Sequence, residues 1–320
     1  MPEKYPEIPS MADVKNAVDR IKPYANRTLV LTSRNLNEMT GGEIFFKCEN
    51  FQRAGAFKFR GACNSVFALS EEDAKRGVAT HSSGNHGQAL ALAAQLRGIP
   101  AYIVMPENSP KVKLHAVKGY GADVIMCESN QTAREETLEK VTADTGAIFI
   151  HPYDHVDVIS GQGTCAHELL EDYPDLDMIL TPVGGGGLLS GTSITIKNIS
   201  PLTKVIGTEP EMADDAYQSF KSGKIQRFDT TNTVADGLRT TLSDRTFSII
   251  RQNVDDIVTV SEESIIRAMR LIWERMNIII EASCSVPFAA ILEEKIDIRH
   301  KRVGIILTGG NVDLDHLPWQ

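Results

Sequence analysis

Short runs of β-branched and other apolar residues alternate with longer amphipathic stretches along almost the whole chain. Strand-like runs include AYIVMP at 101–106, AIFIHP at 147–152, KVIGTE at 204–209 and RVGIILTGG at 302–310. Runs typical of helices lie between the strands, at 84–97, 130–144, 157–172, 187–198, 262–276 and 285–295. This alternation predicts an α/β fold with two open, twisted, mostly parallel sheets and helices on both faces.

The strands within 77–152 are enough for a compact α/β unit of their own. We therefore expect a small domain at 77–152 and a large domain made of 1–70 and 153–320. The chain has 320 residues and is 42% hydrophobic, which is ordinary for a soluble globular protein. Its net charge of −9 argues against nucleic acid or an anionic membrane as a main partner.

The cysteines are scattered and show neither a CxxC pair nor zinc-ligand spacing. They are Cys48, Cys63, Cys127, Cys165 and Cys284. Such a dispersed, odd-numbered set is typical of buried, reduced thiols in a cytoplasmic protein. The first ten residues, MPEKYPEIPS, contain no apolar signal-peptide core, which agrees with a cytoplasmic location.

One strand end runs into four consecutive glycines. In TPVGGGGLLSG at 181–191, Gly184, Gly185, Gly186 and Gly187 separate a strand from a helix. Backbone N–H groups of such a loop, together with the helix N-terminus, can bind a phosphate. A flexible turn is the plainer interpretation. The loop fits neither the Walker motif nor GxGxxG, although Glu209 at a later strand end keeps a dinucleotide-dependent oxidoreductase as an alternative.

Two further strand ends carry small polar residues. In HSSGNHGQ at 81–88, Ser82, Ser83 and Asn85 precede a helical run, where they can cap the helix or hold a carboxylate. In ILTGGN at 306–311, Thr308 can hydrogen-bond a ligand heteroatom. Ligands of open α/β sheets bind at such carboxyl ends of strands, so these loops are candidates for one site.

A lysine flanked by aromatic residues lies in GAFKFRGA at 55–62. Lys58 can be a snorkelling surface side chain or a desolvated amine used for covalent chemistry. Combined with a phosphate loop and a carboxylate loop, the second interpretation suggests pyridoxal phosphate condensed with an amino acid. Phe57 and Phe59 would then shield the amine and stack on the cofactor ring.

Six motifs in register make the chain resemble the serine racemase and threonine/serine dehydratase group of pyridoxal-phosphate enzymes, which have the tryptophan-synthase-β (type II) fold. The motifs are GAFKFRGA, SSGNHGQALA, GQGT, GGGGLLSG, EPEMADDAYQSF and TGGNVD. The stretches ADDAYQSFKSG, GQGTC and TGGNVDLDHLPW look most like bacterial 3-hydroxyaspartate dehydratases, which are ammonia-lyases. The resemblance runs from about Arg20 to the C-terminus.

The resemblance implies roles for individual positions. Lys58 would bind the cofactor aldehyde and act as the base on one face of Cα, with Ser83 on the opposite face. Phe57 would pack on the ring, Asn85 would face the 3′-oxygen, and Thr308 would lie beside the pyridine nitrogen, where relatives more often have serine. Gly184 to Gly187 would hold the phosphate.

The resemblance also implies a substrate loop and a metal site. Ser82, Ser83, Asn85 and His86 match the loop that grips the substrate carboxylate. Glu209, the carbonyl of Ala213, and Asp215 match a site for Mg²⁺, Ca²⁺ or Mn²⁺, ions that prefer oxygen ligands; a solvated helix start is the plainer interpretation of these acids. Two departures concern the pocket, namely Ala56 for serine and EASC at 281–284 for the usual EPSG.

The function expected from these residues is β-elimination from a hydroxy amino acid. For 3-hydroxyaspartate the products are oxaloacetate and ammonia, and the second carboxylate needs a cation or strong donors, for which Arg134, His151 and His155 are candidates. The alternative is a serine racemase with serine and threonine dehydratase activity. A non-catalytic amino-acid-binding protein is a more distant alternative. Relatives are often dimers, so we expect a homodimer that acts on a small molecule.

Overall fold

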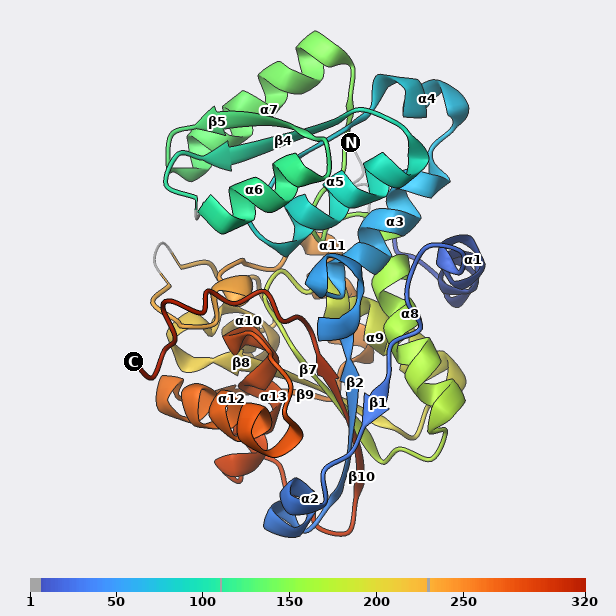
Figure 1. The fold of residues 1–320 in the computed structure, drawn as a ribbon. Helices are drawn as coiled ribbons and strands as arrows, with labels where there is room; N and C mark the ends of the chain where they lie inside the picture. The colour runs from blue at the N-terminus through green and yellow to red at the C-terminus, as the bar shows by residue number, and fades with distance from the viewer. Residues whose placement is uncertain (1–6, 110, 229–230) are drawn as a thin grey trace.

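Two mostly parallel sheets form the framework of the molecule (Figure 1). The computed structural model describes residues 7–109, 111–228 and 231–320. The larger sheet has the strand order β1-β2-β10-β7-β8-β9, and only the β1–β2 pair is antiparallel. The smaller sheet has the order β5-β4-β3-β6 and is parallel throughout. The predicted fold class is therefore confirmed.

The strand bounds follow the apolar runs closely. The larger sheet contains β1 (Val30–Leu31), β2 (Glu43–Cys48), β7 (Met178–Pro182), β8 (Lys204–Pro210), β9 (Asp256–Val260) and β10 (Arg302–Leu307). The smaller sheet contains β3 (Val78–His81), β4 (Ala101–Pro106), β5 (Asp123–Cys127) and β6 (Ile148–Phe149). The strand predicted at 147–152 is thus only two residues long, because the chain turns at His151 into the wall of a cavity. The proposed division into two domains stays a prediction.

Helices connect the strands and cover both faces of each sheet. Those before β7 are α1 (Met11–Ile21), α2 (Arg34–Thr40), α3 (Lys58–Ala68), α4 (Glu71–Arg76), α5 (Asn85–Arg97), α6 (Lys111–Gly119), α7 (Gln131–Thr145) and α8 (Val156–Asp172). Those after β7 are α9 (Gly187–Ile199), α10 (Asp215–Ser222), α11 (Asp244–Asn253), α12 (Glu262–Met276) and α13 (Ala282–Leu292). The helix predicted at 285–295 begins three residues earlier and ends three residues earlier than expected.

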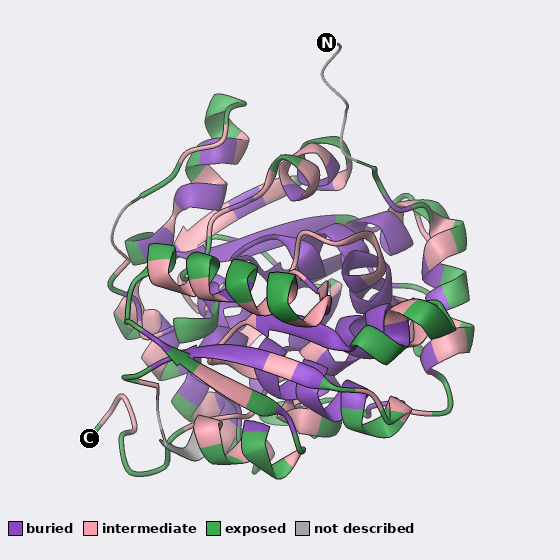
Figure 2. Ribbon diagram, turned by 90° about the horizontal axis from the view of Figure 1, so that it is seen from above, coloured by how far each residue is buried: buried purple, intermediate pink, exposed green. Residues whose placement is uncertain are grey.

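Alternate residues of the strands point to different helical layers. In the larger sheet, Phe46 and Ile305 pack with α12 and α13, whereas Phe45 and Ile306 pack with α8, α9 and α11. This alternation follows from the two-residue period of a strand and explains why the strands are apolar throughout. Figure 2 shows the buried residues in the middle of the molecule and the exposed ones on the outer helix faces.

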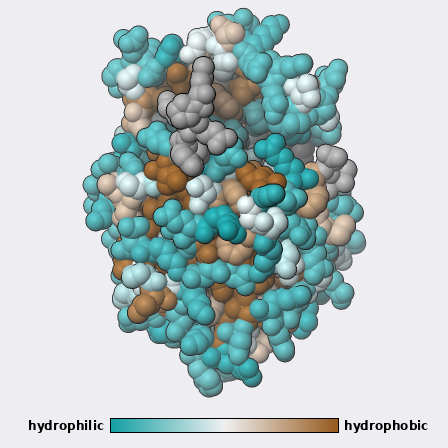
Figure 3. All heavy atoms as spheres, turned by 180° about the vertical axis from the view of Figure 1, so that it is seen from behind, coloured by the Kyte–Doolittle hydropathy of each residue, from teal (hydrophilic) through white to brown (hydrophobic). Residues whose placement is uncertain are grey.

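All five cysteines are free and buried, as predicted. No helix in the described ranges combines the length and the apolar character needed to cross a membrane. On the face shown in Figure 3, hydrophilic atoms predominate and the apolar side chains form several separate groups.

Candidate active site

A cavity of about 720 Å³ opens between the carboxyl ends of strands from the two sheets. It is lined by the residues that the sequence predicted to bind cofactor or substrate or to act in catalysis, with the exceptions of Phe59 and His155. The segments that meet there come from positions 57–58, 81–86, 113, 131–135, 151–153, 182–189, 227–228, 236–243, 283 and 308. Loops distant in sequence thus converge on one site, as the topology of parallel sheets requires.

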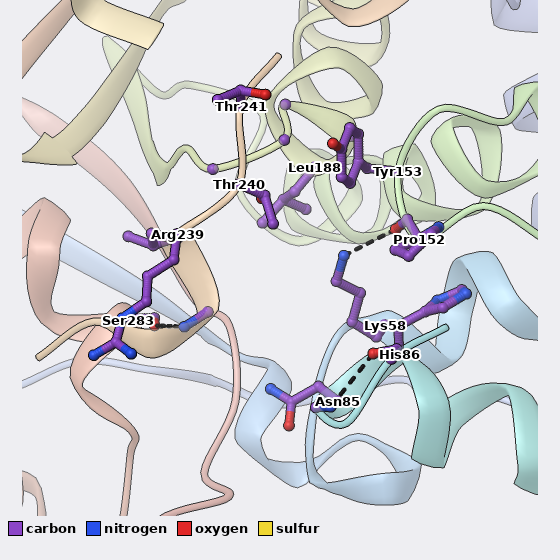
Figure 4. A pocket seen from close by; sticks show the side chains of 18 of the residues that line it. Lys58, Asn85, His86, Pro152, Tyr153, Leu188, Arg239, Thr240, Thr241 and Ser283 are labelled. Atoms are coloured by element: carbon purple, nitrogen blue, oxygen red, sulfur yellow. Dashed lines mark hydrogen bonds between the residues drawn. The ribbon is translucent and has the colours of Figure 1, made fainter. Parts of the chain in front are cut away.

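Lys58 is the first residue of α3, and its side chain points into this cavity (Figure 4). Its Nζ donates a hydrogen bond to the carbonyl oxygen of Pro152 at 2.9 Å and lies 5.2 Å from the centroid of the Phe57 ring. Burial lowers the pKa of Lys58 to about 8, although the charge of Glu281 opposes this shift. The surroundings therefore raise the fraction of the neutral, nucleophilic amine relative to an exposed lysine.

The two phenylalanines beside the lysine have different environments. Phe57 lines the cavity, but Phe59 is fully buried in the core beneath α5 and does not reach it. The expectation that both rings shield the amine is therefore wrong for Phe59. Its position follows from helical geometry, because residues two apart on α3 point to different sides.

Thr308 is brought to Lys58 by pairing between the end of β10 and the residues before α3. The N–H of Phe57 donates to the carbonyl of Thr308 at 2.9 Å, and Ala56 forms a bridge with Gly309. A side chain at Gly309 would place its Cβ 2.9 Å from an oxygen of Glu281, so glycine permits this close approach. Thr308 lies in the cavity wall and is 3% exposed.

The four glycines form a tight loop between β7 and α9. Gly186 has a φ of 82°, in the left-handed region that favours glycine, and caps α9. A Cβ at Gly185 would lie 2.4 Å from the ring of Tyr153, so this ring packs directly on the loop (Figure 4). Backbone N–H groups and the positive end of α9 remain available to a phosphate at the cavity.

The loop Ser82-Ser83-Gly84 precedes α5, which begins at Asn85. The Nε2 of His86 lies 3.2 Å from the carbonyl oxygen of Ile150, so this nitrogen carries the hydrogen. The Nδ1 of His86 is buried and has no hydrogen-bond partner among the described residues. Burial holds the pKa of His86 well below its usual range, so its ring is neutral. His86 can thus offer a carboxylate its backbone N–H, but not a charged ring.

Asn85 is held from both ends of its amide. Its Nδ2 donates to the two oxygens of Glu281 at 2.9 and 3.1 Å, and its Oδ1 accepts from Asn311 at 2.9 Å. Burial raises the pKa of Glu281 to about 7. Glu281 and Asn311 belong to the segments EASC and ILTGGN, which the sequence analysis placed near the site without assigning a role to either residue. Both residues reach Asn85 through contacts between segments distant in sequence, namely the end of β10 and the start of α13.

Two predicted substrate residues offer hydrogen-bond donors to the cavity. Arg134 on α7 has a buried Nε without a hydrogen-bond partner in the described part of the chain. The Nδ1 of His151 accepts from the N–H groups of Tyr153 and Asp154 at 3.3 and 2.9 Å, which leaves the hydrogen on Nε2. Burial lowers the pKa of His151 to about 4, so the ring donates as a neutral group.

His155, the third candidate for the second carboxylate, has a different position. It is the N-cap of α8, where its Nδ1 accepts from the N–H of Asp157 at 3.2 Å, and it does not line the cavity. Tyr153 lies in the cavity instead. Only the nearness of Tyr153 to the predicted His151, two residues away in the sequence, could have indicated that Tyr153 lies in the cavity.

The acidic residues predicted to bind a metal lie together outside the cavity lining. Glu209 and Asp215 are 0% and 1% exposed, and Ala213 is also buried. Glu209 accepts from the N–H groups of Ala216 and Tyr217 at 3.1 and 2.8 Å, whereas the Oδ2 of Asp215 has no partner among the described residues. Burial and the nearby Asp215 raise the pKa of Glu209 well above its usual range, and burial raises that of Asp215 to about 7.

These carboxyl groups fit the oxygen preference of a hard cation, because they are buried, adjacent and incompletely hydrogen-bonded. Over residues 7–109, 111–228 and 231–320, no group of three or more His, Cys, Asp or Glu side chains that could hold a metal occurs. The predicted set contains only two such side chains and relies on a backbone carbonyl for the third ligand.

The fold and the site define an enzyme class in which a lysine amine, a glycine-rich phosphate loop and a carboxylate loop face one cavity. The family model described as "Pyridoxal-phosphate dependent enzyme" matches residues 21–309. The chain belongs to this family of pyridoxal-phosphate-dependent enzymes. Two features of the site fit this cofactor. The loop has no room for a side chain at Gly185, where a Cβ would collide with Tyr153, and burial lowers the pKa of Lys58. The dinucleotide alternative has no support, since Glu209 bonds to backbone N–H groups away from the cavity.

Individual relatives are similar over nearly their whole length. A β-hydroxyaspartate dehydratase of Paracoccus denitrificans is 52% identical over 98% of this chain and 99% of its own. An L-threo-3-hydroxyaspartate ammonia-lyase of Saccharomyces cerevisiae is 50% identical over 96% of this chain and 94% of its own. The crystal structure of a serine racemase from Dictyostelium discoideum superposes with a TM-score of 0.92 at 50% identity, covering 96% of this chain and 99% of that one.

Proposed function

We propose that this protein is an ammonia-lyase that converts 3-hydroxyaspartate into oxaloacetate and ammonia. The observation that carries the proposal is Arg134, whose buried Nε lacks a protein partner in the described structure and whose side chain lines the cavity of Lys58. A guanidinium binds a carboxylate in bidentate fashion, which suits a substrate with a second carboxylate. The names of the relatives from P. denitrificans and S. cerevisiae support the same substrate.

Each residue at the site has a separate role in the proposed reaction. Pyridoxal phosphate, when bound through Lys58, supplies the electron-accepting ring. The freed amine of Lys58 then takes the α-proton of the substrate at Nζ. The backbone N–H groups and hydroxyls of Ser82 and Ser83 orient the α-carboxylate, and Arg134 with the Nε2–H of His151 orients the second one. The neutral hydroxyl of Thr308 would keep the ring a moderate electron acceptor, which favours loss of the β-hydroxyl. That hydroxyl would leave as water with the proton held on Nζ of Lys58, and hydrolysis of the resulting imine then releases oxaloacetate and ammonia.

Serine racemase activity with serine dehydration is the second candidate function. It is favoured by one observation, that Ser83 and Lys58 both line the cavity, where they can act as opposed bases on Cα. The structural similarity to the racemase of D. discoideum supports it. The binding of Mg²⁺, Ca²⁺ or Mn²⁺ at Glu209, Ala213 and Asp215 is part of our proposal. The homodimer and the cytoplasmic location stay predictions.

The test measures keto-acid release from both diastereomers of 3-hydroxyaspartate, from serine and from threonine. We expect one hydroxyaspartate diastereomer to be the best substrate. In Arg134→Gln its kcat/KM should fall about 10- to 100-fold, since a charge-assisted hydrogen bond contributes about 1.5–3 kcal/mol. Serine, which lacks the second carboxylate, should lose much less.

A matched control is Lys140→Gln, which removes an exposed cation from the same helix. It should leave the kinetics with every substrate unchanged. Faster turnover of serine than of either hydroxyaspartate by the unmodified enzyme would reject our preferred substrate and support the second candidate function. An equal fall of kcat/KM with serine and with hydroxyaspartate in Arg134→Gln would show that Arg134 does not bind the second carboxylate.

A further inference from the structure

The hydroxyl of Thr308 has an unexpected neighbour. Its Oγ1 lies 3.3 Å from the sulfur of Cys284, and either atom can donate in this contact. Within the described residues, this is the only side-chain hydrogen bond of the Thr308 hydroxyl. A threonine hydroxyl has a single hydrogen. The group that accepts this hydrogen therefore decides how much of it is left for a ligand in the cavity.

Cys284 is fixed by two further hydrogen bonds. It is the third residue of α13 and is fully buried. Its Sγ donates to the carbonyl oxygen of Gly309 at 2.7 Å and accepts from the N–H of the same residue at 2.9 Å. Because the only thiol hydrogen is directed at Gly309, the sulfur presents a lone pair to Thr308. Burial raises the pKa of the Cys284 thiol far above its usual range, so the hydrogen stays on the sulfur.

We propose that Cys284 is a positioning residue, whose sulfur competes with the pyridine nitrogen of the cofactor for the hydroxyl hydrogen of Thr308. The proposal rests on the proposed function, in which Thr308 faces that nitrogen. A hydroxyl shared with sulfur donates less strongly to the ring nitrogen. The ring is then a weaker electron acceptor, which disfavours long-lived negative charge at Cα and favours rapid loss of the β-hydroxyl. Cys284 thereby biases the enzyme toward elimination and away from racemisation.

Two substitutions at this position should act in opposite directions. Cys284→Ala removes the competing acceptor, so the Thr308 hydroxyl donates more strongly to the ring nitrogen. Cys284→Ser keeps a group that can bond to Gly309 and replaces sulfur with oxygen, a better acceptor, so the hydroxyl donates less strongly to the ring. A purely structural role of Cys284 would give effects of the same sign in both variants.

The experiment measures the ¹⁵N chemical shift of the ring nitrogen, which reports hydrogen bonding to that atom. The unmodified protein and both variants are reconstituted with pyridoxal phosphate labelled with ¹⁵N in the ring, and the ¹⁵N resonance is recorded. In Cys284→Ala it should move toward the value of a hydrogen-bonded or protonated pyridine, and in Cys284→Ser toward that of a free pyridine. With serine, the ratio of racemisation to elimination should rise in Cys284→Ala. Cys127→Ala, which removes a buried thiol from the smaller sheet, should leave the resonance unchanged.

Resonances that stay unchanged, or that move in the same direction in both variants, would overturn the proposal. Should the alanine variant fail to fold, the serine variant decides alone, because an unshifted resonance there rejects the competition. Failure of the proposed function is recognised separately. It would appear as an unmodified enzyme that turns over serine faster than either hydroxyaspartate, whereas an active hydroxyaspartate lyase with unshifted resonances rejects only the role of Cys284.

Discussion

Lys58 owes its reactivity to desolvation, since no described side chain hydrogen-bonds to its amine as a base. The hydrogen bond of Nζ goes to the carbonyl of Pro152, and burial brings the pKa to about 8 from an ordinary value near 10.4. The nearby carboxyl of Glu281 works in the other direction, because its negative charge favours the ammonium. The neutral fraction of the amine is thus set by the balance of burial against one charge.

The covalent capture of pyridoxal phosphate by apo-protein should therefore depend on pH in a defined way. Only the neutral amine attacks the aldehyde, and its fraction grows as the pH rises through the pKa. We expect the rate, followed by stopped-flow absorbance, to rise up to a plateau somewhat above pH 8. In Glu281→Gln the half-maximal rate should occur at lower pH, because the opposing charge is gone. A half-maximal rate near pH 10 would contradict the desolvated environment, and Lys58→Ala should show no visible band.

The end of β8 and the start of α10 place two acidic side chains in the core. Glu209 and Asp215 are buried side by side, and each has a raised pKa mainly because burial disfavours the charged form. Without a cation, the folded state holds these protons up to about pH 7 for Asp215, whereas the unfolded chain releases them near pH 4. The stability gained from the neutral carboxyl is thus present at low pH and is lost as the pH rises toward and through about 7.

Added Mg²⁺ should therefore stabilise the protein more at pH 8 than at pH 5, where protons compete for the same oxygens. We expect the melting temperature at pH 8 to rise by a few degrees with saturating Mg²⁺ and to fall back on addition of EDTA. Asp215→Asn should abolish this rise, while Glu211→Gln, an exposed neighbour, should preserve it. An equal response of Asp215→Asn and the unmodified protein would show that any bound Mg²⁺ lies elsewhere.

Across the whole molecule, a buried ionic network ties the first turn of α3 to the larger sheet. Arg60 is fully buried and donates to both oxygens of Glu49 at 2.7 and 2.8 Å and to both oxygens of Glu168 at 2.8 Å. Lys47 also donates to Glu168 at 2.6 Å, so two cations face two carboxylates. The network joins β2, α3 and α8, and it lies two residues from Lys58 in the sequence.

Arg60→Met should destabilise the whole fold, because it leaves two carboxylates buried with too little positive charge. Breaking a buried ion pair in this way costs about 3–5 kcal/mol. We expect a clearly lower urea midpoint of apo-protein unfolding. Arg270→Met removes an arginine from an exposed helical pair with Glu274 and should change the midpoint little. Similar midpoints for the two variants would show that the network is not a main source of stability.

The parts of the structure that could be predicted are those with a recognisable pattern in the local sequence. Continuous apolar strands and the four glycines mark the sheets and the phosphate loop, because strand burial and tight turns restrict the residues at those positions. Glu281 and Cys284 contact Asn85 and Thr308 through long-range pairing, which leaves no periodic pattern in their own segment. Phe59 was misplaced for a related reason, since the expected symmetry around Lys58 ignored that α3 begins at the lysine itself.

The five buried thiols give the chain a set of built-in reporters. They belong to β2, α3, β5, α8 and α13, so both sheets and three separate helices each hold at least one. A thiol shielded from water reacts with an alkylating reagent only when its own region opens. The order in which Cys48, Cys63, Cys127, Cys165 and Cys284 become modified therefore records the sequence in which the regions of the protein open, without any engineered probe.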